Sequence, residues 1–211
     1  MADVTIDGTV SSEIARAVKA VASHRTDQAT LYAAFIDADF DLYYNKSTDK
    51  GATWGTAVKV DTTVNPTTSY YSIWADWWTP GDTGTKIHIS WNDGVSIRYR
   101  ALDTSDDSLG TQVTVFAGTS SVNAIGTLVD ICKTVGGNIH IHGTIDAGDE
   151  RFHYRSTDGG GSFGSLTDGY LATPAGDWMH LYPAANTGDT NDLLGLYLDA
   201  SANSLGVMLY D

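Results

Sequence analysis

The chain has 211 residues and a formal net charge of −14, and 42% of its residues are hydrophobic. That charge argues against nucleic acids and anionic membranes as partners, and no apolar run reaches the roughly 18–20 residues that span a bilayer. The single cysteine, Cys132, excludes a disulfide within the chain, and Met1–Val4 lacks the basic and apolar regions of a signal peptide. The location stays open, with a virion or release to the extracellular space after lysis among the alternatives.

Short β-branched and aromatic runs, bounded by Gly, Asp and Asn, recur along the chain and are typical of strands. Four hairpins are expected, at 30–36 with 40–44, 86–91 with 95–100, 138–145 with 151–155, and 193–198 with 205–210. An earlier run precedes each hairpin, at 14–23, 70–78, 124–133 and 178–184. A further run follows the first three, at 56–60, 111–116 and 165–171. Four strands in each unit of about 54 residues predict an all-β repeat array.

The two ends of the chain complement each other. The fourth unit lacks its last strand, and residues 4–10 resemble residues 58–64, the last strand of the first unit. We therefore expect residues 4–10 to pair with residues 205–210 and to close the array into a ring. Closure would remove the exposed sheet edges that otherwise template aggregation.

One turn motif, Ser-x-Asp-x-Gly-x-x-aromatic, occurs twice, and its copies start 109 residues apart (156 − 47). A decayed copy lies between them, where Tyr99–Val113 aligns without gaps on Tyr44–Val58. Ser and Asp side chains hold tight turns through backbone N–H groups, and Gly permits positive φ. These residues are therefore interpreted as structural and not catalytic. The motif residues are Ser47, Asp49, Gly51 and Trp54 in the first copy, and Ser156, Asp158, Gly160 and Phe163 in the second.

The motif resembles the Asp box, or bacterial neuraminidase repeat, of sialidase-like β-propellers. The resemblance rests on two good boxes and one decayed copy, and it implies a single β-propeller domain. The expected fold is all-β, with four four-stranded blades closed by the N-terminal strand. The blades are expected at residues 11–64, 65–118, 119–171, and 172–211 plus 1–10. The alternative is a partial propeller completed by self-association.

The catalytic residues that the resemblance implies are not carried over. A sialidase needs three arginines, a Tyr nucleophile with a Glu partner, and an Asp acid–base. The chain has two glutamates, Glu13 and Glu150, and neither has an obvious Tyr partner. A different glycosidase would need two carboxylates across a cleft. The candidate aspartates are interpreted as ordinary turn residues: Asp37, Asp39, Asp41, Asp93, Asp146, Asp149 and Asp199.

Two aromatic clusters, at Tyr70–Trp78 and Asp177–Tyr182, begin the second and fourth units. Exposed aromatic rings flanked by polar groups suit the apolar face of a sugar, although packing between blades would also explain them. The candidate ligand-binding residues are Tyr70, Tyr71, Trp74, Asp177, Trp178 and His180.

The remaining histidines indicate no metal site. His140 and His142 share one face of a strand, with His88 and His153 at related positions. A zinc site would need further ligands that converge, so we interpret them as packed histidines and expect no metal and no cofactor. The sequence favours a non-catalytic binding or structural module, recognising a carbohydrate or serving in a viral or bacterial surface assembly. The alternative is a glycoside hydrolase other than a sialidase.

Overall fold

The computed structural model describes residues 4–6, 8, 16–17, 19–62, 70–117, 129–145, 150–166, 179–184, 190–199 and 204–210. These residues form an all-β structure of four sheets with antiparallel neighbours, apart from one short parallel strand. The helical structure within these ranges is a single 3-10 turn, η1 (Asp76–Trp78). None of the helical structure described is long and apolar enough to cross a membrane.

The sheets follow one another along the chain, and their antiparallel strands run up and down in chain order. The first contains β2 (Val21–Ser23), β3 (Leu31–Ile36), β4 (Leu42–Ser47) and β5 (Val58–Lys59). The second contains β6 (Tyr70–Ala75), β7 (Lys86–Asn92), β8 (Ile97–Asp103), β9 (Ser108–Leu109) and β10 (Val113–Phe116). The second sheet also includes β1 (Arg16–Ala17), which pairs in parallel at its β6 edge. The third contains β11 (Val129–Lys133), β12 (Ile139–Ile145), β13 (Glu150–Ser156) and β14 (Gly164–Ser165). The fourth contains β15 (Met179–Pro183), β16 (Leu193–Asp199) and β17 (Ser204–Tyr210).

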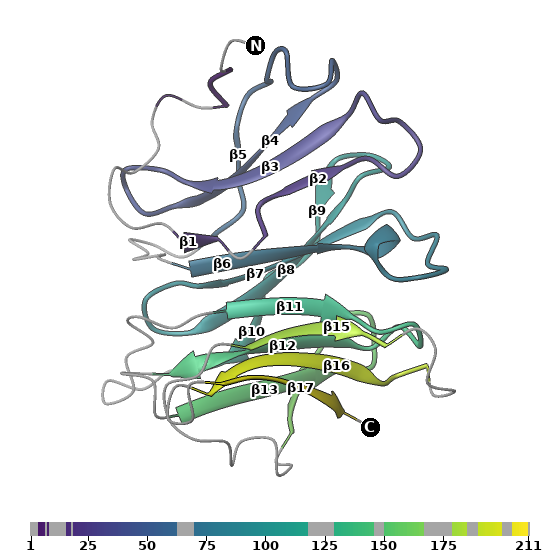
Figure 1. Ribbon diagram of the computed structural model, residues 1–211. Coiled ribbons are helices and arrows are strands. Elements are labelled where there is room, and N and C mark those ends of the chain that lie inside the picture. The colour runs from purple at the N-terminus through teal and green to yellow at the C-terminus, as the bar shows by residue number, and fades with distance from the viewer. Residues whose placement is uncertain are drawn as a thin grey trace.

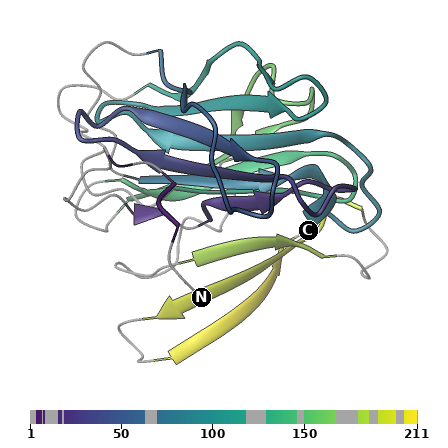
Figure 2. The same cartoon turned by 90° about the horizontal axis from the view of Figure 1, so that it is seen from above.

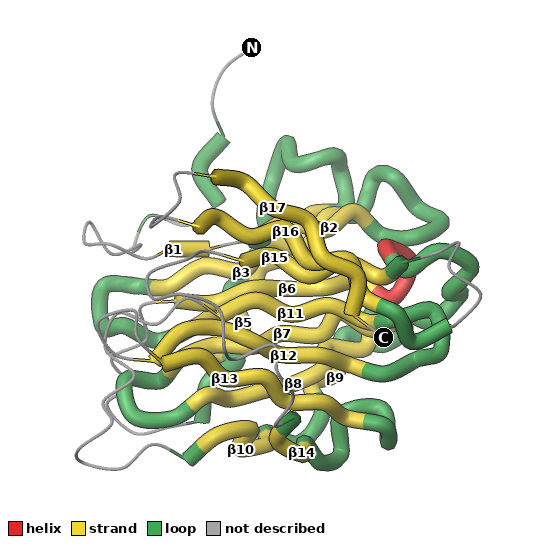
Figure 3. The backbone as a smooth tube through the Cα atoms, turned by 60° about the horizontal axis from the view of Figure 1, so that its bottom comes forward, coloured by secondary structure: helices red, strands yellow, loops and turns green. Residues whose placement is uncertain are grey.

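The first three sheets lie one above another, as Figure 1 shows. Seen from above, the fourth sheet stands at an angle to the others (Figure 2). We call β2, β6, β11 and β15 the leading strands of the four sheets. They are neighbours in space: β6 lies beside β2 and β11, and β11 lies beside β15 (Figure 3). Residues on the leading strands therefore meet although they are far apart in the sequence.

Two apolar cores hold the sheets together, and β6 contributes to both. Its side chains alternate between the two faces of the strand. Tyr71 and Ile73 pack between the first and second sheets. Trp74 packs on the other side, with residues of the third and fourth sheets such as Ile131 and Leu181. The core positions of β6 thus fix the distance between neighbouring sheets.

The four predicted hairpins form as β3–β4, β7–β8, β12–β13 and β16–β17. Two predicted leading strands are shorter than expected. The run 14–23 is interrupted, because β1 (Arg16–Ala17) pairs in parallel with β6 while β2 joins the first sheet. The run 70–78 ends as η1, where the backbone N–H of Thr79 donates to the carbonyl of Asp76 (3.0 Å).

The expected pairing of residues 4–10 with residues 205–210 is not formed by the residues that the structure describes. There β17 pairs with β16 alone, and residues 4–6 form no strand. The carbonyl of Ile6 instead accepts a hydrogen bond from Asn45 Nδ2 (3.2 Å), which holds this segment against the first sheet. Residues 7, 9 and 10 lie outside the described residues.

Candidate functional site

A buried carboxylate, Asp130, organises the polar groups where the leading strands meet. Its Oδ1 accepts hydrogen bonds from Lys19 Nζ (2.6 Å), Ser72 Oγ (2.8 Å) and the backbone N–H of Ile131 (2.8 Å). Its Oδ2 lies 3.2 Å from His180 Nδ1. The side chain is fully buried, and an isolated charge there would be costly. Lys19 therefore balances the charge of Asp130.

The fold explains how these residues converge. Asp130 is on β11, which lies beside both β6 and β15. Ser72 comes from β6 and His180 from β15. Lys19 comes from the break between β1 and β2. The interruption of the first predicted strand thus supplies the cation of the site.

The hydrogen bonds and charges keep Asp130 ionised. Burial by itself would raise the pKa of this carboxyl group. The hydrogen bond from His180 and the positive charge of Lys19 outweigh burial, so the pKa of Asp130 lies well below its ordinary value. A carboxylate held in this state can orient neighbouring donors, but it is a poor general acid at neutral pH.

Two aromatic rings flank Lys19. Its Nζ lies 4.9 Å from the centroid of the Trp74 ring and 5.6 Å from that of Tyr182. The two rings meet edge to face, with centroids 6.3 Å apart. Trp74 is buried, whereas Tyr182 is 45% exposed, and the side chains of Lys19 and His180 are partly exposed. We call Lys19, Ser72, Trp74, Asp130, His180 and Tyr182 the Asp130 site.

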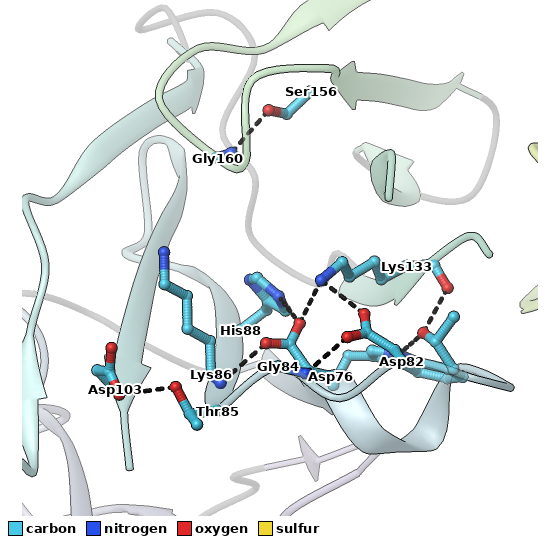
Figure 4. Close-up of polar contacts among 12 residues, drawn as sticks. Asp76, Asp82, Gly84, Thr85, Lys86, His88, Asp103, Lys133, Ser156 and Gly160 are labelled. Carbon is cyan, nitrogen blue, oxygen red and sulfur yellow. Dashed lines mark hydrogen bonds and ion pairs between the residues drawn. The ribbon is translucent and has the colours of Figure 1, made fainter. Parts of the chain in front are cut away.

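A second carboxylate cluster surrounds Asp76 in η1 (Figure 4). Its Oδ1 lies 2.9 Å from His88 Nε2 and accepts a hydrogen bond from Lys133. Lys133 also pairs with Asp82 (2.8 Å), and His88 Nδ1 lies 2.7 Å from the Tyr99 hydroxyl. Burial would raise the pKa of Asp76, but the contacts with His88 and Lys133 hold it well below its ordinary value. This cluster therefore ties the second sheet to the third.

The predicted ligand-binding residues do not form one group. Trp74 and His180 both belong to the Asp130 site. Tyr71 is buried on the opposite face of β6, where its hydroxyl donates to the carbonyl of Ala34 (2.8 Å) and burial raises its pKa to about 12. Tyr70 is half-buried at the start of β6. Asp177 and Trp178 lie outside the described residues.

The two box turns have the same internal hydrogen bonds. In the first, Ser47 Oγ donates to Asp49 Oδ1 (2.8 Å), and the backbone N–H of Gly51 donates to Ser47 Oγ (2.8 Å). The backbone N–H of Thr53 donates to Asp49 Oδ1 (2.8 Å). Bonds from Thr53 lower the pKa of Asp49 to about 2. The second turn repeats this pattern with Ser156, Asp158, Gly160 and Ser162. Figure 4 shows the bond from the backbone N–H of Gly160 to Ser156 Oγ.

The box glycines have positive φ, +82° at Gly51 and +96° at Gly160. The box aromatics, Trp54 and Phe163, are half-buried.

Two of the other aspartates considered as catalytic candidates, Asp37 and Asp93, hold turns, whereas Asp41 pairs with Lys59 Nζ (2.6 Å). Asp37 Oδ1 accepts from the backbone N–H groups of Asp39 (3.0 Å) and Asp41 (2.9 Å). Asp93 Oδ1 accepts from the backbone N–H of Ser96 (2.7 Å). Asp146 and Asp149 lie outside the described residues, as does the side chain of Asp199.

The histidines of the third sheet are packed together. His140 Nδ1 lies 2.9 Å from His153 Nε2, and both side chains are buried. Within the described ranges, no three His, Cys, Asp or Glu side chains are placed to hold a metal ion.

The prediction from sequence missed Lys19, Ser72, Asp130 and Tyr182. Asp130 had a recognisable signal, because it stands within the apolar run Leu128–Cys132 of an expected strand. A charged residue there must be paired if both faces of the strand are buried. Ser72 and Tyr182 stand within the two aromatic clusters but were not among the candidate residues. Lys19 carries no such signal, since its meeting with Asp130 depends on how the sheets are placed.

Comparisons with known proteins find the fold but no family. No family model and no curated protein sequence matches the chain. Among solved structures, a triple arginine-to-alanine mutant of AofleA from Arthrobotrys oligospora has a TM-score of 0.59 and 14% identity, over 91% of this chain and 54% of that one. Hadza microbial sialidase Hz136 has a TM-score of 0.58 and 11% identity, over 92% and 44%. The chain has a sialidase-like fold.

A polysaccharide lyase gives a third match. The PL25 ulvan lyase bound to -[GlcA(1-4)Rha3S]- has a TM-score of 0.55 and 14% identity, over 90% of this chain and 56% of that one. The chain thus spans about half the length of these similar structures. At such low identities the likeness establishes the fold and carries no activity with it.

Proposed function

We propose that the chain is a non-catalytic carbohydrate-binding module, built as an Asp-box β-propeller whose blades are the four sheets. The proposed blades span residues 11–64, 65–118, 119–171 and 172–211. The shared fold of the sialidase and of the lyase with its bound saccharide supports a role with carbohydrates. The repeated hydrogen bonds of the two box turns support the Asp-box assignment.

The exposed ring of Tyr182 beside Lys19 and His180 carries the proposal. An aromatic face next to a few fixed polar groups is the usual composition of a small-ligand site. Here Lys19 Nζ and His180 Nδ1 are both held by the buried Asp130 (2.6 and 3.2 Å). A sugar ring would stack on Tyr182, and its hydroxyl groups would meet the two polar side chains.

The alternative of a glycoside hydrolase is weaker. Such an enzyme needs a carboxylic acid whose pKa is raised toward neutrality. Asp76 and Asp130 are both ion-paired and have pKa values well below the ordinary range. The ion-pair partners of Asp76 and Asp130 thus favour the ionised carboxylate, whereas a general acid must be protonated before it acts.

The test is a glycan array with neutral and anionic oligosaccharides, followed by titration calorimetry with the strongest binder. Tyr182→Ala should weaken binding by more than about 1 kcal/mol, as at an interface hot spot. Val95→Ala, at an exposed apolar residue of another turn, should leave binding unchanged. Equal binding by Tyr182→Ala and the parent would overturn this site. Failure of the parent to bind any glycan would favour a structural role in a surface assembly.

A further inference from the structure

A separate pocket of about 380 Å³ lies beside the first box turn. Most of its lining comes from β4, β5 and the turn between them, while Asp107 comes from the turn between β8 and β9 of the second sheet. Its volume is in the range of small-ligand sites. The lining residues are Tyr44, Lys46, Thr48, Thr53, Trp54, Gly55, Thr56, Val58 and Asp107.

A charged pair is fixed at the wall of this pocket. Lys46 Nζ donates to Asp107 Oδ2 (2.6 Å), and the hydroxyl of Tyr32 donates to Asp107 Oδ1 (2.7 Å). The hydroxyl of Tyr44 donates to the carbonyl of Asp107 (3.0 Å). Lys46 and Asp107 remain partly exposed, so the ammonium group and the carboxylate both retain room for further hydrogen bonds. Their charges cancel, and the wall presents donors and acceptors without net charge.

The turn of the second sheet forms without counterparts of Lys46 and Trp54. Gly55 N–H donates to the carbonyl of Lys46, and Gly110 N–H donates to the carbonyl of Ala101 at the equivalent place, both at 2.8 Å. The backbone contact is therefore the same in both sheets. Ala101 occupies the position of Lys46, and Leu109 occupies that of Trp54. Alanine and leucine accompany the same backbone hydrogen bond there, so closing this turn does not require the ammonium group or the indole of the first sheet.

The third sheet repeats the basic and aromatic pair. Arg155 pairs in register with Gly164, and Phe163 precedes that glycine. The pair thus accompanies the two intact boxes and is missing beside the decayed one. Trp54 itself is half-buried, so part of its ring remains open to a ligand.

We propose that this pocket binds a neutral sugar residue of a glycan. The indole of Trp54 would cover the apolar face of the sugar, and Lys46 Nζ and Asp107 Oδ would bond to neighbouring hydroxyl groups. The chain carries a net charge of −14 and the pocket pair is neutral, so an acidic sugar would gain no balancing charge. The inference rests on the proposed carbohydrate-binding function and adds a second site to it.

The experiment uses an array of neutral oligosaccharides and calorimetry with the strongest binder. The double variant K46A/W54L copies the residues of the second sheet. Asp107→Asn is the second variant, because Asn tolerates the positive φ of +61° at this position. Both should weaken binding at least tenfold, and both should keep the melting temperature of the parent within a few degrees. Tyr182→Ala, in the Asp130 site, should leave binding in this pocket intact.

The outcomes separate the two sites. Loss of binding in K46A/W54L and Asp107→Asn, with binding retained by Tyr182→Ala, supports the pocket even if the Asp130 site proves wrong. Full affinity and stoichiometry in both pocket variants overturn the pocket and leave the Asp130 site standing. A parent protein that binds no neutral oligosaccharide also overturns the pocket.

Discussion

At the residue scale, the buried histidines of the third sheet are informative because they must stay neutral. His140 Nδ1 and His153 Nε2 are 2.9 Å apart, so one ring donates a hydrogen bond and the other accepts it. Burial is the main cause that lowers the pKa of His140 to about 3, and it also lowers the pKa of His153 well below its ordinary value. Protonating both rings would place two positive charges against each other in the core.

Because these histidines are neutral in the folded protein, mild acid should lower its stability at pH values above those at which carboxylates titrate. The pKa of His140 is lower in the folded state than its unfolded value of about 6.5, so the unfolded chain binds more protons. Its stabilising contribution is complete above about pH 6.5 and is lost as the pH falls toward 3. From His140 alone, the free energy of unfolding should fall by about 2 kcal/mol between pH 8 and pH 5.

Urea unfolding at pH 8, 6.5 and 5 measures this loss. Asp76 and Asp130 have lowered pKa values, so their contributions are lost only below the unfolded carboxyl pKa of about 4. His140→Gln removes one titrating group and should flatten the dependence. The same free energy of unfolding at pH 8 and pH 5 would contradict the prediction.

At the scale of elements, turns of one sheet lock onto tyrosines of the preceding sheet. Asp107, in a turn of the second sheet, accepts hydrogen bonds from the hydroxyl groups of Tyr32 and Tyr44 in the first sheet. In the same way, Phe163 of the third sheet packs on Tyr99 of the second, with ring centroids 5.0 Å apart. Tyr44 and Tyr99 occupy equivalent positions in the repeat. The box turn therefore connects neighbouring sheets as well as closing its own.

Two adjacent glycines of the second box turn allow the contact with Tyr99 to be distinguished from the cost of a left-handed backbone. Gly159 and Gly160 both have positive φ (+74° and +96°). A Cβ at Gly159 would meet nothing within 4 Å, whereas one at Gly160 would come within 2.3 Å of the Tyr99 hydroxyl. Gly159→Ala should cost about 1–2 kcal/mol from the left-handed backbone alone. Gly160→Ala should cost about 1–3 kcal/mol more through overpacking.

Thermal and urea unfolding of the two variants measure that difference. The Gly160→Ala change should also disturb the near-ultraviolet circular dichroism, because Tyr99 must move away from His88. Equal stability of Gly159→Ala and Gly160→Ala would show that the turn does not press on Tyr99.

The sequence predicts the local elements of this structure but not the contacts between its sheets. The hairpins are predictable because each is local, and the expected run 138–145 is observed as β12 (Ile139–Ile145). The Asp130 site is not, because Lys19 and His180 reach Asp130 from strands far apart in the chain. Trp54 follows Gly51 in its turn as the motif predicts, and its side chain is half-buried. Local patterns specify the strands, while the contacts between sheets determine which side chains meet.

At the scale of the whole molecule, one face of the fourth sheet carries exposed apolar side chains in the part of the chain that the structure describes. Leu181 and Leu193 are fully buried in the core shared with the second and third sheets. On the opposite face, Tyr182 is level with Leu194, and Leu194 with Leu209. Val207 and Leu209 there are 64% and 56% exposed.

We expect this apolar face to bind a second copy of the chain. In a two-fold arrangement the same apolar rows would meet each other, which suits an isologous contact. The net charge of −14 makes two copies repel, and salt screens that repulsion. Association measured by sedimentation velocity should therefore strengthen between 50 mM and 500 mM salt. Leu209→Glu should weaken it at every salt concentration, whereas Val95→Glu, on another exposed turn, should not. Because Tyr182 lies on the same face, association should also compete with glycan binding at the Asp130 site. A protein that stays monomeric at millimolar concentration and high salt would show that the face serves something other than a second copy.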